Sequence, residues 1–224
     1  MTVRPPPPLA LTRRQIIVAG SAMLGVRPAS AAWSIAVSFA PARPGGAPAG
    51  FDFARTGQGA LGAWSASPHP SDSTGYILTQ TSSDPTDYRF PLAIYHDILA
   101  ADAAVTVRFQ TVSGNVDQAA GIALRLTDAS NYYVVRANAL EDNVNLYRVV
   151  QGSRREIKGA SARVSPHAWH ELGLAAEKDR FTIRFNGAVL FSVTDRTFAG
   201  PGRVALWTKA DSVTRFDAMT IQTP

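Results

Sequence analysis

The stretch GIALRLTDASNYYVVRAN, residues 121–138, decides the class of fold. Apolar side chains occupy every second position on both sides of a polar turn at residues 128–131. Alternation with period two marks a strand that buries one face, so the stretch predicts an antiparallel hairpin. The alternating residues are Ile122, Leu124 and Leu126 before the turn, and Tyr133, Val135 and Ala137 after it.

The same alternation recurs along the chain, as at Val105, Val107 and Phe109. Turn residues separate the runs, and Asn186-Gly187 is typical of a type I′ hairpin turn. About eleven to thirteen short strands, spaced by about 8–12 residues, predict an antiparallel sandwich or barrel. Outside the leader we expect at most one helical turn, at Tyr95–Ala100.

Residues 1–31 have the three-part layout of an export signal. The pair Arg13-Arg14 precedes an apolar run, and Ala29-Ser30-Ala31 offers small residues to a signal peptidase. The run of about eleven apolar or small residues is too short to span a bilayer, which needs about twenty. The paired arginines favour the bacterial twin-arginine route. We therefore expect a periplasmic or secreted protein without a stable membrane anchor.

The charge balance follows from the same leader. The 224-residue chain has a formal charge of +5, which by itself would suggest nucleic acid or an anionic membrane as partner. The leader holds four arginines and no acidic residue, so cleavage after residue 31 would lower the charge to +1. The sequence therefore does not favour a nucleic-acid partner. The absence of cysteine excludes a disulfide scaffold, thiol catalysis and Cys-ligated zinc.

The composition also divides the chain. Residues 32–50 are rich in Pro, Gly and Ala, which predicts a linker. Residues 51–224 then form a single domain, without an internal repeat of a length that would indicate a solenoid.

Several segments of this domain resemble a known superfamily. Trp169-His170-Glu171-Leu172, the strand at residues 181–185 and the Asn186-Gly187 turn resemble concanavalin A-like and laminin-G-like sandwich domains. Residues 200–208 and Phe216-Asp217 are similar to the last two strands of that superfamily. The chain looks closest to bacterial exported domains described as 3-keto-disaccharide hydrolase-like. The resemblance covers residues 51–224 and implies an antiparallel jelly-roll β-sandwich, but it does not choose among binding modules, lectins, glycosidases and lyases.

Basic, amide and aromatic side chains are the candidates for a ligand site. Arg125 and Arg136 lie opposite the apolar faces of adjacent predicted strands, so we expect both to point to one side. Many members of the superfamily hold ligands on a concave sheet face, where a Trp would stack on a pyranose and Arg or Asn would bond its hydroxyls. The alternative is an ordinary solvated sheet face. The expected set is Arg125, Arg136, Asn138, Trp207 and Lys209, with Tyr88 and Arg89 from a polar rim loop as second-rank candidates.

Catalytic and metal sites are poorly supported. The four glutamates do not form the alternating acid pair that a glycosidase of this superfamily uses. The histidines form no metal-binding array, and we expect His170 to be structural. Asp217 and Asp52 are the candidates for a Ca²⁺ site, which the resemblance implies for many members; the alternative is that Asp217 caps the last strand. We expect Arg154-Arg155 to form a solvated turn. We expect Trp64 and Trp169 to be core residues.

The leading hypothesis is non-catalytic binding of a glycan or sugar-like small molecule, without a cofactor. The second is hydrolase or lyase cleavage of a 3-keto-glycoside, in which the keto group acidifies the neighbouring C–H so that one base and a cation suffice. A third is a structural or interaction domain with an inert groove. The candidate bases for the second hypothesis are Asp87, Asp117, Glu141 and His96.

Overall fold

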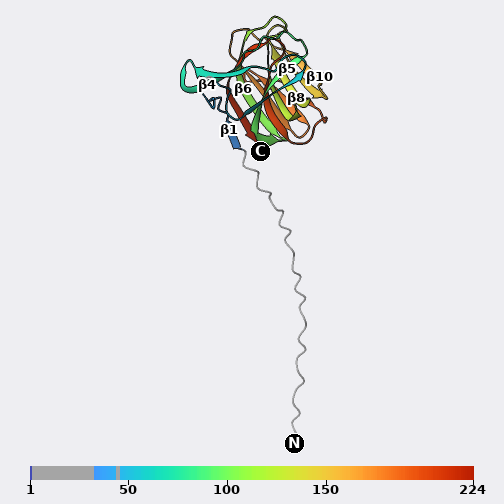
Figure 1. Ribbon diagram of the computed structural model, residues 1–224. Helices are drawn as coiled ribbons and strands as arrows, with labels where there is room; N and C mark the ends of the chain where they lie inside the picture. The colour runs from blue at the N-terminus through green and yellow to red at the C-terminus, as the bar shows by residue number, and fades with distance from the viewer. Residues whose placement is uncertain (2–32, 44–45) are drawn as a thin grey trace. The chain divides into compact units, whose positions relative to one another are not determined.

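Figure 1 shows the computed structural model, which describes residues 1, 33–43 and 46–224. The regular structure of these residues consists of fifteen β-strands, so none of them belongs to a helix that could cross a membrane. The strands form two antiparallel sheets, and the predicted all-β jelly-roll sandwich is confirmed. Apart from Met1, the predicted export signal lies outside the described residues.

Sheet I has the strand order β13-β12-β11-β6-β15-β4-β3, and β1 pairs with β15 beside them. Its strands are β1 (Trp33–Ala36), β3 (Trp64–His69), β4 (Asp72–Gln80), β6 (Ala103–Ser113), β11 (His170–Glu177), β12 (Arg180–Phe185), β13 (Ala188–Thr194) and β15 (Val213–Thr223). Sheet II has the order β10-β9-β8-β7-β14-β5-β2. Its strands are β2 (Phe51–Gly57), β5 (Arg89–Ala100), β7 (Ala119–Asp128), β8 (Asn131–Asn138), β9 (Asn143–Val150), β10 (Ser153–Ser161) and β14 (Gly202–Trp207).

The expected helical turn at Tyr95–Ala100 is wrong, because β5 runs through it without a break. Tyr95 pairs with Phe51 of β2 on one side and with Val204 of β14 on the other, and these two ladders hold the segment extended. The Asn186-Gly187 turn between β12 and β13 has positive φ at both residues, as a type I′ turn requires.

The sandwich begins before residue 51, so the predicted domain boundary is wrong. Trp33 pairs with Thr223 at the end of β15, and the next three residues of β1 continue this ladder. Val37 and Phe39 then enter the core between the sheets. Pro41 and Pro48 form an isolated β-bridge, so the described residues on both sides of this stretch belong to the domain and not to a linker in front of it.

Sheet II buries both of its faces, and this decides where a ligand can reach it. On β8, Tyr133 and Val135 point into the core between the sheets, whereas Tyr132 and Val134 join a second apolar cluster on the other, concave face. Trp207 of β14 belongs to this second cluster, and its indole N–H donates to the Tyr132 hydroxyl at 3.2 Å. Burial raises the pKa of Tyr132 to about 12, so this hydroxyl stays protonated.

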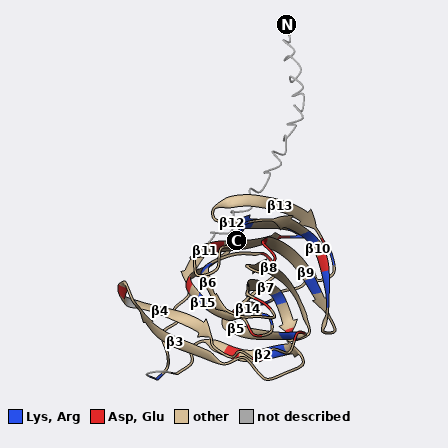
Figure 2. Ribbon diagram, turned by 90° about the horizontal axis from the view of Figure 1, so that it is seen from above, with Lys and Arg blue, Asp and Glu red and all other residues tan. Residues whose placement is uncertain are grey.

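Contacts between distant strands of sheet II close over the concave face. The Tyr88 hydroxyl, just before β5, donates to the Gly152 carbonyl in the β9–β10 turn at 3.1 Å and accepts the Arg154 N–H at 2.7 Å. The Thr56 hydroxyl of β2 donates to the Ala129 carbonyl in the β7–β8 turn. In Figure 2 the strands from β10 to β2 lie in an arc, with basic residues on β9 and β10. The concave face is therefore partly filled by side chains of its own sheet.

Candidate functional site

Arg154 of β10 lies over an aromatic platform at the centre of the concave face. Its guanidinium carbon is 4.8 Å from the ring centroid of Phe90, 4.6 Å from that of Tyr147 and 5.7 Å from that of Trp207. No carboxylate of the described residues forms an ion pair with Arg154, and its Nη1 is buried without a hydrogen-bond partner. Stacking on ring faces holds a guanidinium in place while leaving its N–H edge free. Arg154 is thus a positioned donor without an acceptor.

Arg136 of β8 contacts the same platform. It pairs with Gly121 of β7, which in turn pairs with Trp207 of β14, so Arg136 and Trp207 lie in line across the sheet. Its guanidinium carbon is 5.4 Å from the Tyr147 ring centroid, and its Nη2 donates to Glu141 at 2.6 Å and to Asn143 at 2.9 Å. Its Nε is buried without a partner. Burial acts to raise the pKa of Glu141, but the hydrogen bonds from Asn143 and Arg136 outweigh it and hold the pKa below its ordinary value. Glu141 is therefore an ionised, half-exposed acceptor at the rim.

Lys209, just after β14, supplies an ammonium group on the concave face beside the Arg136 and Arg154 guanidinium groups. Its Nζ lies 2.7 Å from Asp87 and 2.9 Å from Asp117, and Asn138 donates to Asp117 at 3.0 Å. Burial acts to lower the pKa of Lys209, but these two carboxylates outweigh it and raise the pKa, so the amine stays charged. Burial raises the pKa of Asp117, with Lys209 opposing the change. Asp87 is exposed, and Lys209 lowers its pKa.

These side chains place donors and acceptors close together on the concave face. Arg136 and Asn138 are themselves buried and bound to Glu141 and Asp117. The Arg154 guanidinium and the Lys209 ammonium group provide donors, and the exposed carboxylates of Asp87 and Glu141 provide acceptors. Such a mixture suits a ligand whose neighbouring hydroxyls both donate and accept. We call this set the concave-face site: Arg154, Arg136, Asn138, Lys209, Tyr88, Asp87 and Glu141.

The structure places five of the predicted ligand residues on this face: Arg136, Asn138, Trp207, Lys209 and Tyr88. Arg136 and Asn138 share one face of β8 as expected, and Lys209 reaches the same end from the segment after β14. Tyr88 packs on Phe90 with ring centroids 4.7 Å apart and remains 42% exposed.

The prediction that Trp207 offers its ring to a sugar does not fit the structure. Trp207 lies on the concave face but has no exposed surface, because Phe90 stacks on it and Arg154 covers it. Its ring supports Arg154 and does not face solvent.

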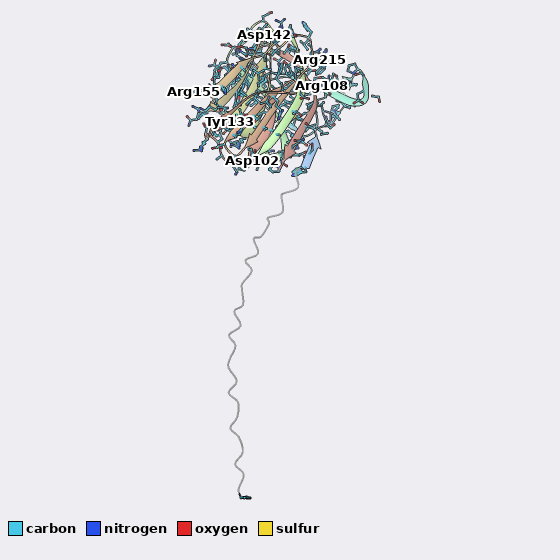
Figure 3. All side chains as sticks on the ribbon, turned by 180° about the vertical axis from the view of Figure 1, so that it is seen from behind. Asp102, Arg108, Tyr133, Asp142, Arg155 and Arg215 are labelled. Carbon is cyan, nitrogen blue, oxygen red and sulfur yellow. The ribbon has the colours of Figure 1, made fainter. Side chains whose placement is uncertain are left out.

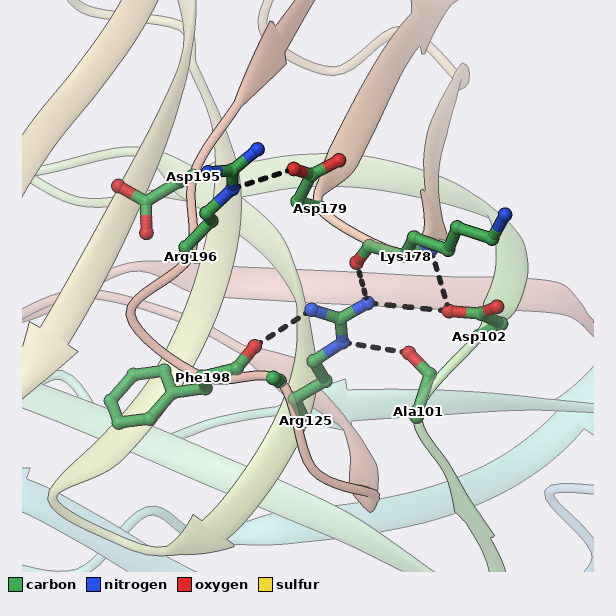
Figure 4. A pocket seen from close by; sticks show the side chains of 9 residues that line it. Ala101, Asp102, Arg125, Lys178, Asp179, Asp195, Arg196 and Phe198 are labelled. Carbon is green, nitrogen blue, oxygen red and sulfur yellow. Dashed lines mark hydrogen bonds and ion pairs between the residues drawn. The ribbon is translucent and has the colours of Figure 1, made fainter.

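The prediction that Arg125 points to the same side as Arg136 is wrong. Arg125 donates to the carbonyls of Ala101, Phe198 and Lys178 at one end of the sandwich (Figure 4). It forms the floor of a pocket of about 530 Å³ there. Because these donors join three loops, Arg125 stabilises the end of the sandwich and is not free for a ligand on the concave face.

Arg89 also has a structural place. It is fully buried, and it donates to the carbonyls of Ala60, Leu61 and Ala210 and to the Ser82 hydroxyl. Its guanidinium does not reach the concave face, although Tyr88 beside it does.

Arg154 is the site residue that the sequence reading missed. The segment Ser153-Arg154-Arg155-Glu156 has no apolar alternation from which to assign a face. The signal that could have found it is the Gln151-Gly152 turn, which pairs Arg154 with Val149. Arg154 then shares the face of Tyr147, two residues along β9, and Arg155 takes the opposite face.

The candidate Ca²⁺ ligands do not fit a cation. Asp217 lies 3.1 Å from Arg108 and 3.5 Å from His69, so the Arg108 guanidinium already pairs with its carboxylate. Asp52 is exposed on β2, and the described residues contain no group of three or more His, Asp or Glu that could hold a metal ion.

The residues predicted to be structural are mostly buried. The His170 ring forms hydrogen bonds with the Ser165 carbonyl and the Asn186 side chain. Trp64 is buried, while Trp169 is half-buried under Arg108.

The chain is similar to known proteins in fold but not in sequence. No protein-family model matches the chain, and no curated protein matches it in sequence. The fold is similar to the carbohydrate binding module CBM66 from Bacillus subtilis, at 20% identity and a TM-score of 0.60, over 76% of this chain and 95% of the module.

Two further solved structures are similar over most of the chain. The Ca²⁺/Man-bound exoplasmic/lumenal domain of VIP36 is 11% identical, with a TM-score of 0.57 over 85% of this chain and 88% of that domain. The β-glucanase of Bacillus licheniformis is 12% identical, with a TM-score of 0.52 over 85% of this chain and 98% of the enzyme. The chain therefore shares the jelly-roll β-sandwich fold of these proteins.

Proposed function

We propose that the concave-face site binds a glycan or another polyhydroxylated small molecule without converting it. The observation that carries this proposal is Arg154, a guanidinium seated on three aromatic rings with no carboxylate partner. A vicinal pair of hydroxyl oxygens matches the N–H edge of such a group. The fold shared with a carbohydrate-binding module supports the same reading. We further propose that the protein is exported and acts in the periplasm or outside the cell.

The proposal is tested with a glycan array, followed by calorimetric titration of the best ligand. We expect Arg154→Gln to weaken binding by about tenfold or more, because one or two charge-assisted hydrogen bonds are lost. Arg154→Lys keeps the charge but loses the planar fork, and we expect an intermediate loss.

The matched control is Arg196→Gln, since Arg196 is an exposed arginine that pairs with Asp179 in the β11–β12 turn, outside the concave-face site. If Arg154→Gln binds as tightly as the control, the assignment of the site is wrong. If no glycan binds the parent protein at all, the binding function is wrong.

A second candidate function rests on Glu141, an ionised and half-exposed carboxylate beside the Arg136 cation. This pair supplies the one base and one cation that cleavage of a 3-keto-glycoside needs. Incubation with 3-keto-trehalose separates the two functions, because only an enzyme releases product and only an enzyme loses turnover in Glu141→Gln. The absence of both binding and product would favour an interaction domain.

A further inference from the structure

A second pocket lies on the opposite face of the β9–β10 hairpin from Arg154. It has a volume of about 370 Å³ and is lined by Arg148, Val150, Gln151, Ser153 and Arg155. Pockets of roughly 300–1,000 Å³ are the usual size for small ligands. In Figure 3 Arg155 lies at the side of the molecule, and none of the predicted sugar-binding residues lines this pocket.

The pocket is lined mainly by hydrogen-bond donors. Among the described residues, the side chains of Arg155, Ser153 and Gln151 have no hydrogen-bond or ion-pair partner. Arg148 has one partner, Asp195, at 2.7 Å. No carboxylate lines the pocket. The unfilled donors of two guanidinium groups and a hydroxyl therefore face a common space.

The two arginines are direct cross-strand neighbours, because Arg155 pairs with Arg148 in the β9–β10 ladder. Like charges at such positions lie about 5 Å apart at Cβ and destabilise a sheet. Asp195 balances only one of them, since it already accepts the Tyr133 hydroxyl at 2.6 Å, the Thr197 N–H at 2.8 Å and Arg148. Its carboxylate is 8% exposed and fixes the Arg148 guanidinium. One arginine is thus positioned, and the other has no counter-ion.

We propose that this pocket is an oxyanion site, in which a sulfate, phosphate or carboxylate group binds between the guanidinium groups of Arg148 and Arg155. Charge-assisted, forked hydrogen bonds from arginine are the strongest that a protein side chain offers to such anions. The Ser153 hydroxyl, which also lines the pocket, supplies a further donor. A bound anion would relieve the repulsion between the two arginines, which explains why the pair is built without a second carboxylate. This site is separate from the concave-face site and does not depend on it.

The test compares Arg155→Gln with the control Arg163→Gln, both exposed arginines whose loss leaves the core intact. Thermal midpoints are measured with inorganic sulfate, inorganic phosphate or glucuronate, against chloride at equal ionic strength. Sulfate also stabilises proteins generally by exclusion from their surfaces. The quantity compared is therefore the increase in thermal midpoint on going from chloride to each anion, taken as the difference between the two variants.

We expect two opposite effects of Arg155→Gln. In chloride its thermal midpoint should be equal to or above that of the parent protein, because a like-charge pair has been removed. The site-specific increase with the preferred anion should disappear, and the anion's dissociation constant should rise by about tenfold or more. Arg155→Lys should restore part of the increase. Comparison of sulfate, phosphate and glucuronate shows whether the site prefers a sulfate, phosphate or carboxylate group.

Two results would overturn the proposal. One is an equal response of Arg155→Gln and Arg163→Gln to every anion. The other is a lower midpoint of Arg155→Gln in chloride, which would show that Arg155 already has a stabilising partner. The Arg154 variants serve as a further check, because they should keep the anion response in full.

Discussion

Arg89 and Arg125 are charged side chains with almost no exposed surface, and both donate mainly to backbone carbonyl oxygens. A guanidinium offers five donors in a fixed plane, so one side chain can satisfy carbonyls of several loops at once. Arg89 joins residues 60–61 to Ala210 in this way. These arginines look like ligand contacts in a sequence because nothing local shows that loops far along the chain will surround them.

Replacement of Arg89 by Met tests this role. The variant removes the donor to the buried Ala210 carbonyl and to the part-buried carbonyls of residues 60–61, and it takes away the hydrogen bonds that join these loops. We expect the free energy of unfolding to fall by about 3 kcal/mol. Urea denaturation measures the change. Arg196→Met removes an exposed arginine and should change stability by no more than about 0.5 kcal/mol. Equal effects of the two substitutions would contradict the structural role of Arg89.

At the scale of the element, a bulge in β7 changes the face of the residues that follow it. Ile122 and Leu124 point into the core between the sheets, but Leu126 belongs to the second cluster on the concave face. Against β14, β7 has one extra residue between Ala123 and Leu126, and Arg125 within this bulge has a φ of 51°. An extra residue in a strand reverses the alternation beyond it. The sequence could not show this, since an apolar Leu126 suits either cluster.

The bulge depends on Gly202 of β14. A Cβ atom at Gly202 would lie 2.2 Å from the Arg125 carbonyl carbon and 2.5 Å from the Leu126 nitrogen, and backbone atoms cannot move aside cheaply. We expect Gly202→Ala to destabilise the protein by about 1–3 kcal/mol, as overpacking does. Gly200→Ala is the matched control, because a Cβ there meets nothing within 4 Å. Thermal unfolding of both variants would reveal the difference, and similar midpoints would contradict this account.

At the scale of the whole molecule, local alternation suffices to predict the sandwich but not the side chains that partly fill its concave face. The contacts across this face join Tyr88 to Gly152 and Thr56 to Ala129, pairs that lie far apart in sequence. The sequence therefore indicates Arg136, Asn138 and Lys209 as members of a polar face. It does not show that Trp207 is covered or that Arg154 covers it.

Export concerns the whole chain, and the leader makes it testable. Replacement of Arg13 and Arg14 by Lys keeps the charge but removes the guanidinium pair of the proposed twin-arginine signal. We expect full-length precursor to accumulate in the cytoplasm, whereas the parent protein is recovered outside it with Ala32 as its first residue. Cell fractionation and N-terminal sequencing measure both outcomes. Arg4→Lys is the control, and unchanged export of the double variant would contradict the assigned route.

The covering of Trp207 by Arg154 has an optical consequence. An indole whose face carries a cation and whose N–H is tied to a tyrosine hydroxyl is sensitive to any displacement of that cation. A ligand that draws the Arg154 guanidinium toward itself would change the emission of this indole without touching it. The difference in fluorescence between the parent protein and Trp207→Phe would then report occupancy of the concave face, so Trp207 would serve as an intrinsic fluorescent probe of binding.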